Sequence, residues 1–335
     1  MTFNAFLTSM FGGLGQGLLY APVAIGVFMS LRIMKKPDLT IEGTFLFGAV
    51  IAMTMLHNNA HFALTLIVAP LGGALTGLTT ALIHTKLKID AIISGLLVTL
   101  ALFTVSLLVM GSSNISAPFD SFIFAPVRDQ LIAVGLRPFN ALLWSQIIVG
   151  GIILAVVIAI LYFLYNTSFG LSIRATGDNE YMSRSNSVNT DSRKISSLVI
   201  SNSITGLAGA LVAQQQNVAN LATGAGTLII GLASLVIGEV ITPKSGSMLT
   251  RFLFISVGSI IYFLCISVII FTGILSSEWT RLLQAAFALI ALCIPKLRQM
   301  LPIWFAKLRQ MLPIWFARLR QRLLKWLTQR AEEAK

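Results

Sequence analysis

Long apolar segments separated by short polar connections make up most of the chain. Between 43 and 110 the only formal charges are Lys86, Lys88 and Asp90, which share one connection. This is the pattern of a membrane protein, since a charge at the bilayer centre costs about 2.5–3.5 kcal/mol. The pattern predicts an all-α, polytopic transmembrane helical bundle of about nine spans. The predicted spans are 12–31, 43–56, 62–83, 91–110, 141–165, 195–213, 227–241, 252–271 and 279–294.

Basic residues fall in every second connection between these spans. They follow the first, third, fifth, seventh and ninth spans, whereas the intervening connections carry few charges. Cytoplasmic loops are enriched in Lys and Arg, so this alternation predicts an N-terminus outside and a C-terminus in the cytoplasm. The spans 43–56 and 227–241 are short for a full crossing. We therefore expect tilted or broken helices there, inside the bundle.

The composition supports a membrane protein and separates a C-terminal tail. Hydrophobic residues make up 56% of the chain and charged residues 11%, with a mean hydropathy of +0.85; soluble domains carry about 25% charged residues. Ten of the 24 Lys and Arg residues behind the net charge of +12 lie in 296–335. We therefore expect this charge to lie beside the membrane, and we expect no nucleic-acid partner. The predicted domains are a membrane domain, 1–295, and a basic amphipathic tail, 296–335, in which an 11-residue segment is repeated. The repeat itself is either a tandem duplication without a dedicated function or a segment that anchors to the membrane or contacts an ATPase partner.

A polar insert, 166–194, interrupts the apolar segments. Gly170 and Gly177 bracket a stretch long enough for one or two helical turns, and basic residues flank it. One interpretation is an ordinary solvated loop. The other is a docking segment for a soluble cytoplasmic partner.

A few polar residues lie inside or beside the predicted spans. Asp38 and Glu42 are four residues apart after Pro37, which suits either a helix start or a site beside a translocation path. Glu239 could be a functional intramembrane acid or the partner of nearby Lys244 in an ion pair.

At the other membrane face, the sequence places Gln214 and Asn217 at the outer mouth. Their side chains could contact a solute or an external binding protein. They complete the set of candidate pathway residues.

No catalytic or metal-binding constellation accompanies these residues. The sequence lacks GxxxxGK[ST], GxGxxG, HExxH, CxxC and GxSxG motifs. We therefore expect no enzymatic activity and no metal site. A polytopic chain without reactive groups is expected to transport, anchor or sense. Besides an ATP-driven permease, the alternatives are a secondary transporter driven by an ion gradient and a membrane anchor or assembly protein.

Two motifs resemble one transport family. The segment Pro37-Asp-Leu-Thr-Ile-Glu-Gly-Thr-Phe45 and the loop Thr167-x-x-Gly170-x-x-Ile-Arg174-Ala-Thr-Gly177-Asp-Asn-Glu180 are similar to elements of permeases for branched-chain amino acids and ribose. The first motif is most similar to permeases grouped with uptake of tryptophan or other aromatic amino acids. The resemblance covers about residues 12–295, in the same order.

This resemblance implies a type II ABC importer in the bacterial cytoplasmic membrane. Such an importer has two permease copies, an extracytoplasmic solute-binding protein, and two cytoplasmic ATPase subunits that hold ATP and Mg, so no cofactor is expected in this chain. The resemblance further implies that the helix around Gly170–Asn179 fits a groove on the ATPase. Leu171 and Ile173 would then fill its apolar part, and Arg174, Asp178 and Asn179 would make polar contacts.

Overall fold

The computed structural model describes residues 3–243, 246–272, 282, 285–286 and 288–289. The chain divides into two compact units, Met1–Leu289 and Ile290–Lys335, and all described residues belong to the first. The predicted tail, 296–335, and most of the predicted ninth span therefore lie outside the described residues.

Within the described part, eight helical segments are long and apolar enough to cross a membrane. Each coincides with one of the first eight predicted apolar segments, which confirms the polytopic helical fold. The segments are built from α1 (Phe3–Phe28) with the π-helical turn Met29–Ile33, α2 (Thr40–His57), α3 (Phe62–Lys86), α4 (Ala91–Met110), α6 (Pro138–Asn166), α9 (Thr190–Gln216), α10 (Thr227–Ile241) and α11 (Met248–Phe271).

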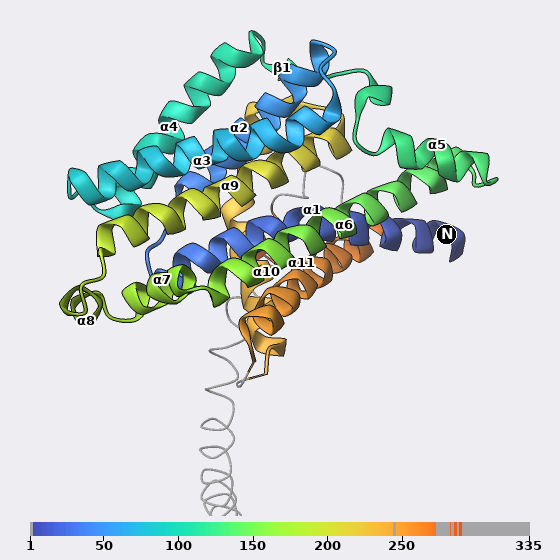
Figure 1. The fold of residues 1–335 in the computed structure, drawn as a ribbon. Coiled ribbons are helices and arrows are strands. Elements are labelled where there is room, and N and C mark those ends of the chain that lie inside the picture. Colours follow the sequence, from blue (N-terminus) through green and yellow to red (C-terminus); the bar gives the residue numbers. More distant parts are fainter. Residues whose placement is uncertain (1–2, 244–245, 273–281, 283–284, 287, 290–335) are drawn as a thin grey trace, which may run out of the picture. The chain divides into compact units, whose positions relative to one another are not determined.

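The spanning helices form two groups that meet along α1 and α9. In the first group α2 packs against α3, α4 and α9, and α4 lies at its outer edge (Figure 1). In the second group α1 packs against α6, α10 and α11. Because α1 also contacts α9, the two groups share one continuous bundle.

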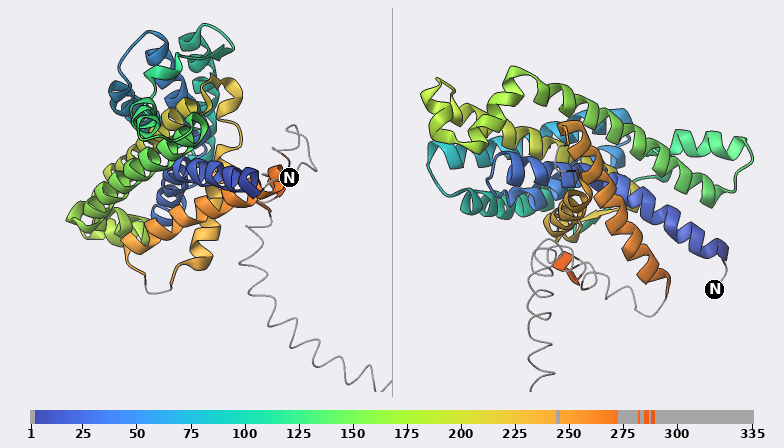
Figure 2. Two further views of the ribbon diagram at one scale, coloured as in Figure 1. Left: turned by 90° about the vertical axis from the view of Figure 1, so that its right-hand side faces the viewer. Right: turned by 90° about the horizontal axis from the view of Figure 1, so that it is seen from below.

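Short elements lie at the two ends of these spans. The strands β1 (Asn114–Ile115) and β2 (Ala219–Asn220) pair antiparallel, and α5 (Ala125–Ala133) packs beside the start of α6. The helices α7 (Ser168–Asp178) and α8 (Glu180–Ser185) lie at the opposite end of α6, as two views show (Figures 1 and 2). The polar insert is therefore a compact helical element, as its glycine spacing predicted.

Glycines bring the backbones of α2, α3 and α9 into direct contact. A side chain at Gly48 would meet the carbonyl of Gly206, and one at Gly206 would lie 2.7 Å from the carbonyl oxygen of Ala69. Only glycine permits such an approach, which is typical of packed membrane helices. These three helices therefore pack backbone against backbone.

Apolar side chains also cover the outward faces of the first group and α6. Leu75 of α3 is 62% exposed, Leu100 of α4 57% and Phe163 of α6 70%. In a soluble protein such surfaces would be unstable in water. Here they fit the hydrocarbon interior of a bilayer.

Candidate functional site

Helix α7 folds back sharply against the end of α6. The hydroxyl of Thr167 donates to the carbonyl of Leu164 (2.6 Å) and accepts from the N–H of Gly170 (3.3 Å), so it caps the new helix. A side chain at Gly170 would meet the backbone of Leu164 and Tyr165. The threonine and the glycine together explain why one helix ends and another begins within two residues.

The other bracketing glycine seats α7 on the end of α1. A side chain at Gly177 would meet the carbonyl of Ile33 in the π-helical turn. Next to this contact, the ammonium of Lys35 pairs with a carboxylate oxygen of Asp178 at 2.9 Å. Helix α7 thus touches the connection that leads from α1 to α2.

One face of α7 is buried in the bundle and the other is exposed. Ile173 is completely buried and Thr176 is 3% exposed, whereas Leu171 is 52% exposed and Arg174 is also exposed. The expectation that Ile173 fills a partner's groove is therefore not met in this structure, because its side chain packs inside this chain. Leu171 remains available to a partner.

Helix α8 is held to the start of α9 by one carboxylate. Glu180 accepts from the ammonium of Lys194 (2.6 Å) and from the guanidinium of Arg184 (3.3 Å). The hydrogen bond from Lys194 holds the pKa of Glu180 below its usual range. The side chain of Asn179 accepts from the N–H of Met182 (3.0 Å) and caps α8.

A buried polar cluster joins α2, α3 and α9 close to this segment. Asp38 is 2% exposed; its carboxyl accepts from the N–H of Thr40 (2.9 Å) and from the side-chain amide of Asn202 (2.7 Å). Asn202 in turn accepts from the hydroxyl of Thr44 (2.7 Å), which hydrogen-bonds the hydroxyl of Thr76 (2.7 Å). Asp38 thus lies just before α2, where its carboxyl accepts from the first N–H of the helix, as the helix-start interpretation expected, and it also ties α2 to α9.

Sequence reasoning missed Asn202, Thr44 and Thr76. The missed signal was a polar stripe on apolar helices: Thr40, Thr44, Thr76 and Thr80 recur at spacings of four. Such a stripe predicts a polar face that must find partners inside the bundle.

The two other acids also have partners from distant segments. Glu42 accepts from the N–H of Gly226 (3.1 Å) at the start of α10, so the irregular connection before α10 reaches down along α2. Glu239 binds Arg32 through two hydrogen bonds, of 2.6 and 2.7 Å. The ion pair considered from sequence thus exists with Arg32, and Lys244 lies outside the described residues.

At the other end, Gln214 is completely buried. Its side chain accepts from the N–H of Ile123 (2.9 Å) and donates to the hydroxyl of Thr65 (3.3 Å). It therefore does not face an open mouth in this structure. Asn217 is exposed and ends α9 in the left-handed conformation, with φ 58°.

The sequence comparisons give the arrangement its context. The family model described as "Branched-chain amino acid transport system / permease component" matches residues 9–292. The chain belongs to this permease family. It is the permease component of an ABC importer, and no solved structure matches it.

Several named relatives are similar over about two thirds or more of this chain. A tyrosine transport system permease protein of Clostridioides difficile is 32% identical over 78% of this chain and 83% of its own. A probable branched-chain amino acid transport permease protein, LivH, of Methanocaldococcus jannaschii is 25% identical over 78% of this chain and 89% of its own. An L-arabinose ABC transporter permease protein, AraH, of Azospirillum brasilense is 26% identical over 67% of this chain and 64% of its own. Permeases of this family act with an ATPase and a solute-binding protein.

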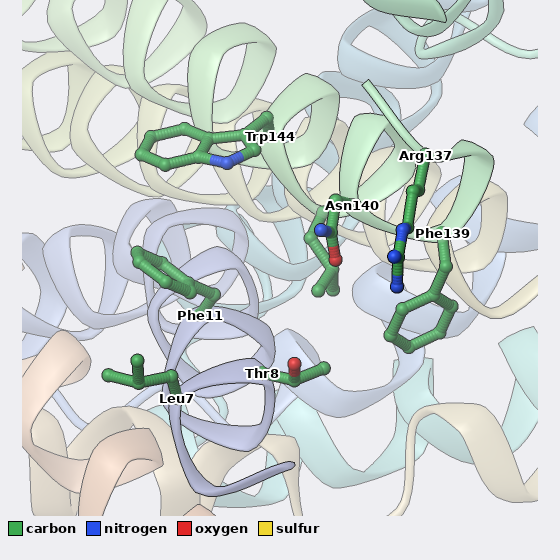
Figure 3. Close-up of a pocket in the computed structure, with 8 residues that line it drawn as sticks. Leu7, Thr8, Phe11, Arg137, Phe139, Asn140 and Trp144 are labelled. Carbon is green, nitrogen blue, oxygen red and sulfur yellow. The ribbon is translucent and has the colours of Figure 1, made fainter. Parts of the chain in front are cut away.

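A cavity of about 480 Å³ lies on the permease at the end opposite α7, between α1 and α6. Figure 3 shows Phe11 and Trp144 on one side of it and Arg137, Phe139 and Asn140 on the other. The ring centroids of Phe11 and Trp144 are 5.1 Å apart. Aromatic residues beside an arginine are typical of the membrane–water interface, so this cavity marks where the spans leave the bilayer.

Proposed function

We propose that the permease forms a homodimeric passage for an amino acid or a similar small solute in the bacterial cytoplasmic membrane. In this proposal a separate ATPase holds ATP and Mg, and an external binding protein delivers the solute. The N-terminus lies outside and the C-terminus in the cytoplasm, as the distribution of basic residues favours. The similarity to a tyrosine transport permease supports an amino acid as the solute.

One observation carries the mechanical part of the proposal. Helix α7 is exposed on one face and, on the other, rests on the π-helical turn that precedes α2. A partner that displaces the exposed residues Leu171 and Arg174 would therefore move α7 as a rigid body. The displacement would reach the bundle through the buried contacts of Gly177 and Ile173. In this proposal Arg174, Asp178 and Asn179 contribute the polar side of the contact, and Leu171 its apolar side.

A reconstituted complex tests this role. The permease is purified with its ATPase in nanodiscs, and ATP hydrolysis is measured with and without solute-loaded binding protein. Arg174→Glu should lower the stimulated rate at least about fivefold, since reversing a charge at an interface replaces attraction by repulsion. Arg137→Glu is the matched control, because it reverses an exposed arginine at the other end of the same bundle.

Two results would count against the proposal. Equal stimulation in wild type and Arg174→Glu would remove Arg174 from the contact. Labelling of a cysteine placed at exposed Leu171 by a reagent outside the cell would put the whole segment on the wrong side of the membrane.

Uptake assays with tyrosine, other amino acids and arabinose would identify the solute.

A further inference from the structure

A second cavity, of about 410 Å³, lies on the same side as α7. It is formed by the connection before α2, the connection between α3 and α4, helix α8 and the start of α9. Four cationic side chains line it, together with two carboxylates: Lys36, Lys88, Arg184, Lys194, Glu180 and Asp191. We refer to it as the basic cavity.

Two of the four cations form no salt bridge among the described residues, although the charge of Lys36 contributes to the lowered pKa of Glu180. Lys194 and Arg184 pair with Glu180, and Arg184 also lies 3.9 Å from Asp191. Within the same described part, no carboxylate lies within ion-pair distance of Lys36 or Lys88. With four cations and two carboxylates in its lining, the cavity therefore carries two positive charges in excess of its acids.

The surroundings of the cavity lead into the apolar surface of the bundle. Leu87, beside Lys88, is 67% exposed, and Ile93, in the first turn of α4, is 53% exposed. Tyr181 of α8, next to Glu180 in sequence, is 90% exposed, and tyrosines are enriched at the headgroup level of membranes. A ligand with a negative head and apolar chains would match both parts of this surface.

We propose that the basic cavity binds the headgroup of an anionic phospholipid, with its phosphate near Lys36 and Lys88 and its acyl chains along the outward face of α4. Basic cavities between membrane helices at the cytoplasmic side are suited to such headgroups. Helix α8 and the start of α9 form one wall of the cavity. A bound lipid would therefore stabilise the position of α8 and of α7, which directly precedes it. This role does not depend on which solute is transported.

Native mass spectrometry of the full chain in lipid mixtures tests the proposal. Phosphatidylglycerol is the probe, and phosphatidylcholine is the neutral reference. The cavity double variant combines Lys36→Gln with Lys88→Asn. Asparagine is chosen at 88 because Lys88 has φ 56° and asparagine tolerates that conformation. Each lysine is expected to contribute about fivefold to binding, so the double variant should bind phosphatidylglycerol about twenty-fivefold more weakly.

A matched control removes the same charge from the same side of the membrane. Lys86→Gln with Arg251→Gln changes two exposed residues that do not line the cavity, and this variant should bind like wild type. Unfolding temperatures in phosphatidylcholine show whether each variant is folded. If the cavity double variant does not fold, Lys88→Asn alone changes an exposed side chain and should still lose about fivefold.

Other outcomes would overturn the lipid assignment. Equal losses in both double variants would mean that only general surface charge attracts the lipid. Displacement of phosphatidylglycerol by millimolar inorganic phosphate would identify free phosphate as the ligand. Unchanged lipid binding with loss of the copurifying ATPase would show that the lysines receive an acidic side chain of that partner.

Discussion

Replacing Asn202 tests whether the buried polar cluster fastens α9 to α2. Asn202→Leu keeps the side-chain volume close to that of asparagine but removes the donor to Asp38 and the acceptor for Thr44. Hydrogen bonds between membrane helices contribute about 0.6 kcal/mol each on average and up to about 1.7. The loss of two such bonds is therefore expected to cost about 1 kcal/mol.

The carboxyl left behind adds a second cost. Asp38 is 2% exposed, so water cannot replace the lost donor. A buried acceptor without its partner costs about 1–3 kcal/mol. Together the two effects predict that Asn202→Leu lowers the free energy of unfolding by about 3 kcal/mol.

Unfolding by SDS in mixed micelles, followed by tryptophan fluorescence, measures this loss. Asn140→Leu is the control, since it replaces an exposed asparagine and should change stability by less than about 0.5 kcal/mol. Adding Asp38→Asn to Asn202→Leu should cost less than Asp38→Asn costs alone, because the partner is already gone. Equal stability of Asn202→Leu and the control would refute the assigned role of the cluster.

Three further predictions concern α7, α8 and the ion pair of Glu239. Gly177→Val should lower stability by about 2 kcal/mol by lifting α7 from the π-helical turn, while Gly151→Val, which has open space around it, should be neutral in the same unfolding assay. Glu180→Gln should lower the unfolding temperature at pH 7. Because the folded-state pKa of Glu180 is lowered, the wild-type advantage is present above its ordinary value of 4.5 and disappears as pH falls through the folded-state value. Glu239→Gln should cost about 1 kcal/mol, and replacing its arginine partner as well should cost less than the sum of the two single changes.

The sequence was sufficient for the membrane-spanning fold and for the position of the short helix α7. Uninterrupted apolar segments reveal spans because a bilayer excludes charge, and Gly170 and Gly177 mark where the short helix meets other backbones. Which face of α7 is exposed was not predictable. Ile173 and Leu171 are both apolar, and only the fold-back against α6 decides which one is buried.

Side-chain pairs between residues distant in the sequence also could not be predicted. Glu239 has Lys244 nearby in sequence but binds Arg32, 207 positions away. Asp38 and Asn202 are 164 positions apart. Neither pairing follows from local spacing, because both depend on how α1, α2, α9 and α10 pack.

The glycine contacts between α2, α3 and α9 limit how the transporter can change shape. Surfaces joined through side chains can slide, because rotamers exchange as they move. Main chains in direct contact have no such freedom, since a small shift brings carbonyl oxygens into collision. We therefore expect these three helices to move as one unit during a transport cycle, with the passage opening and closing where they border their neighbours.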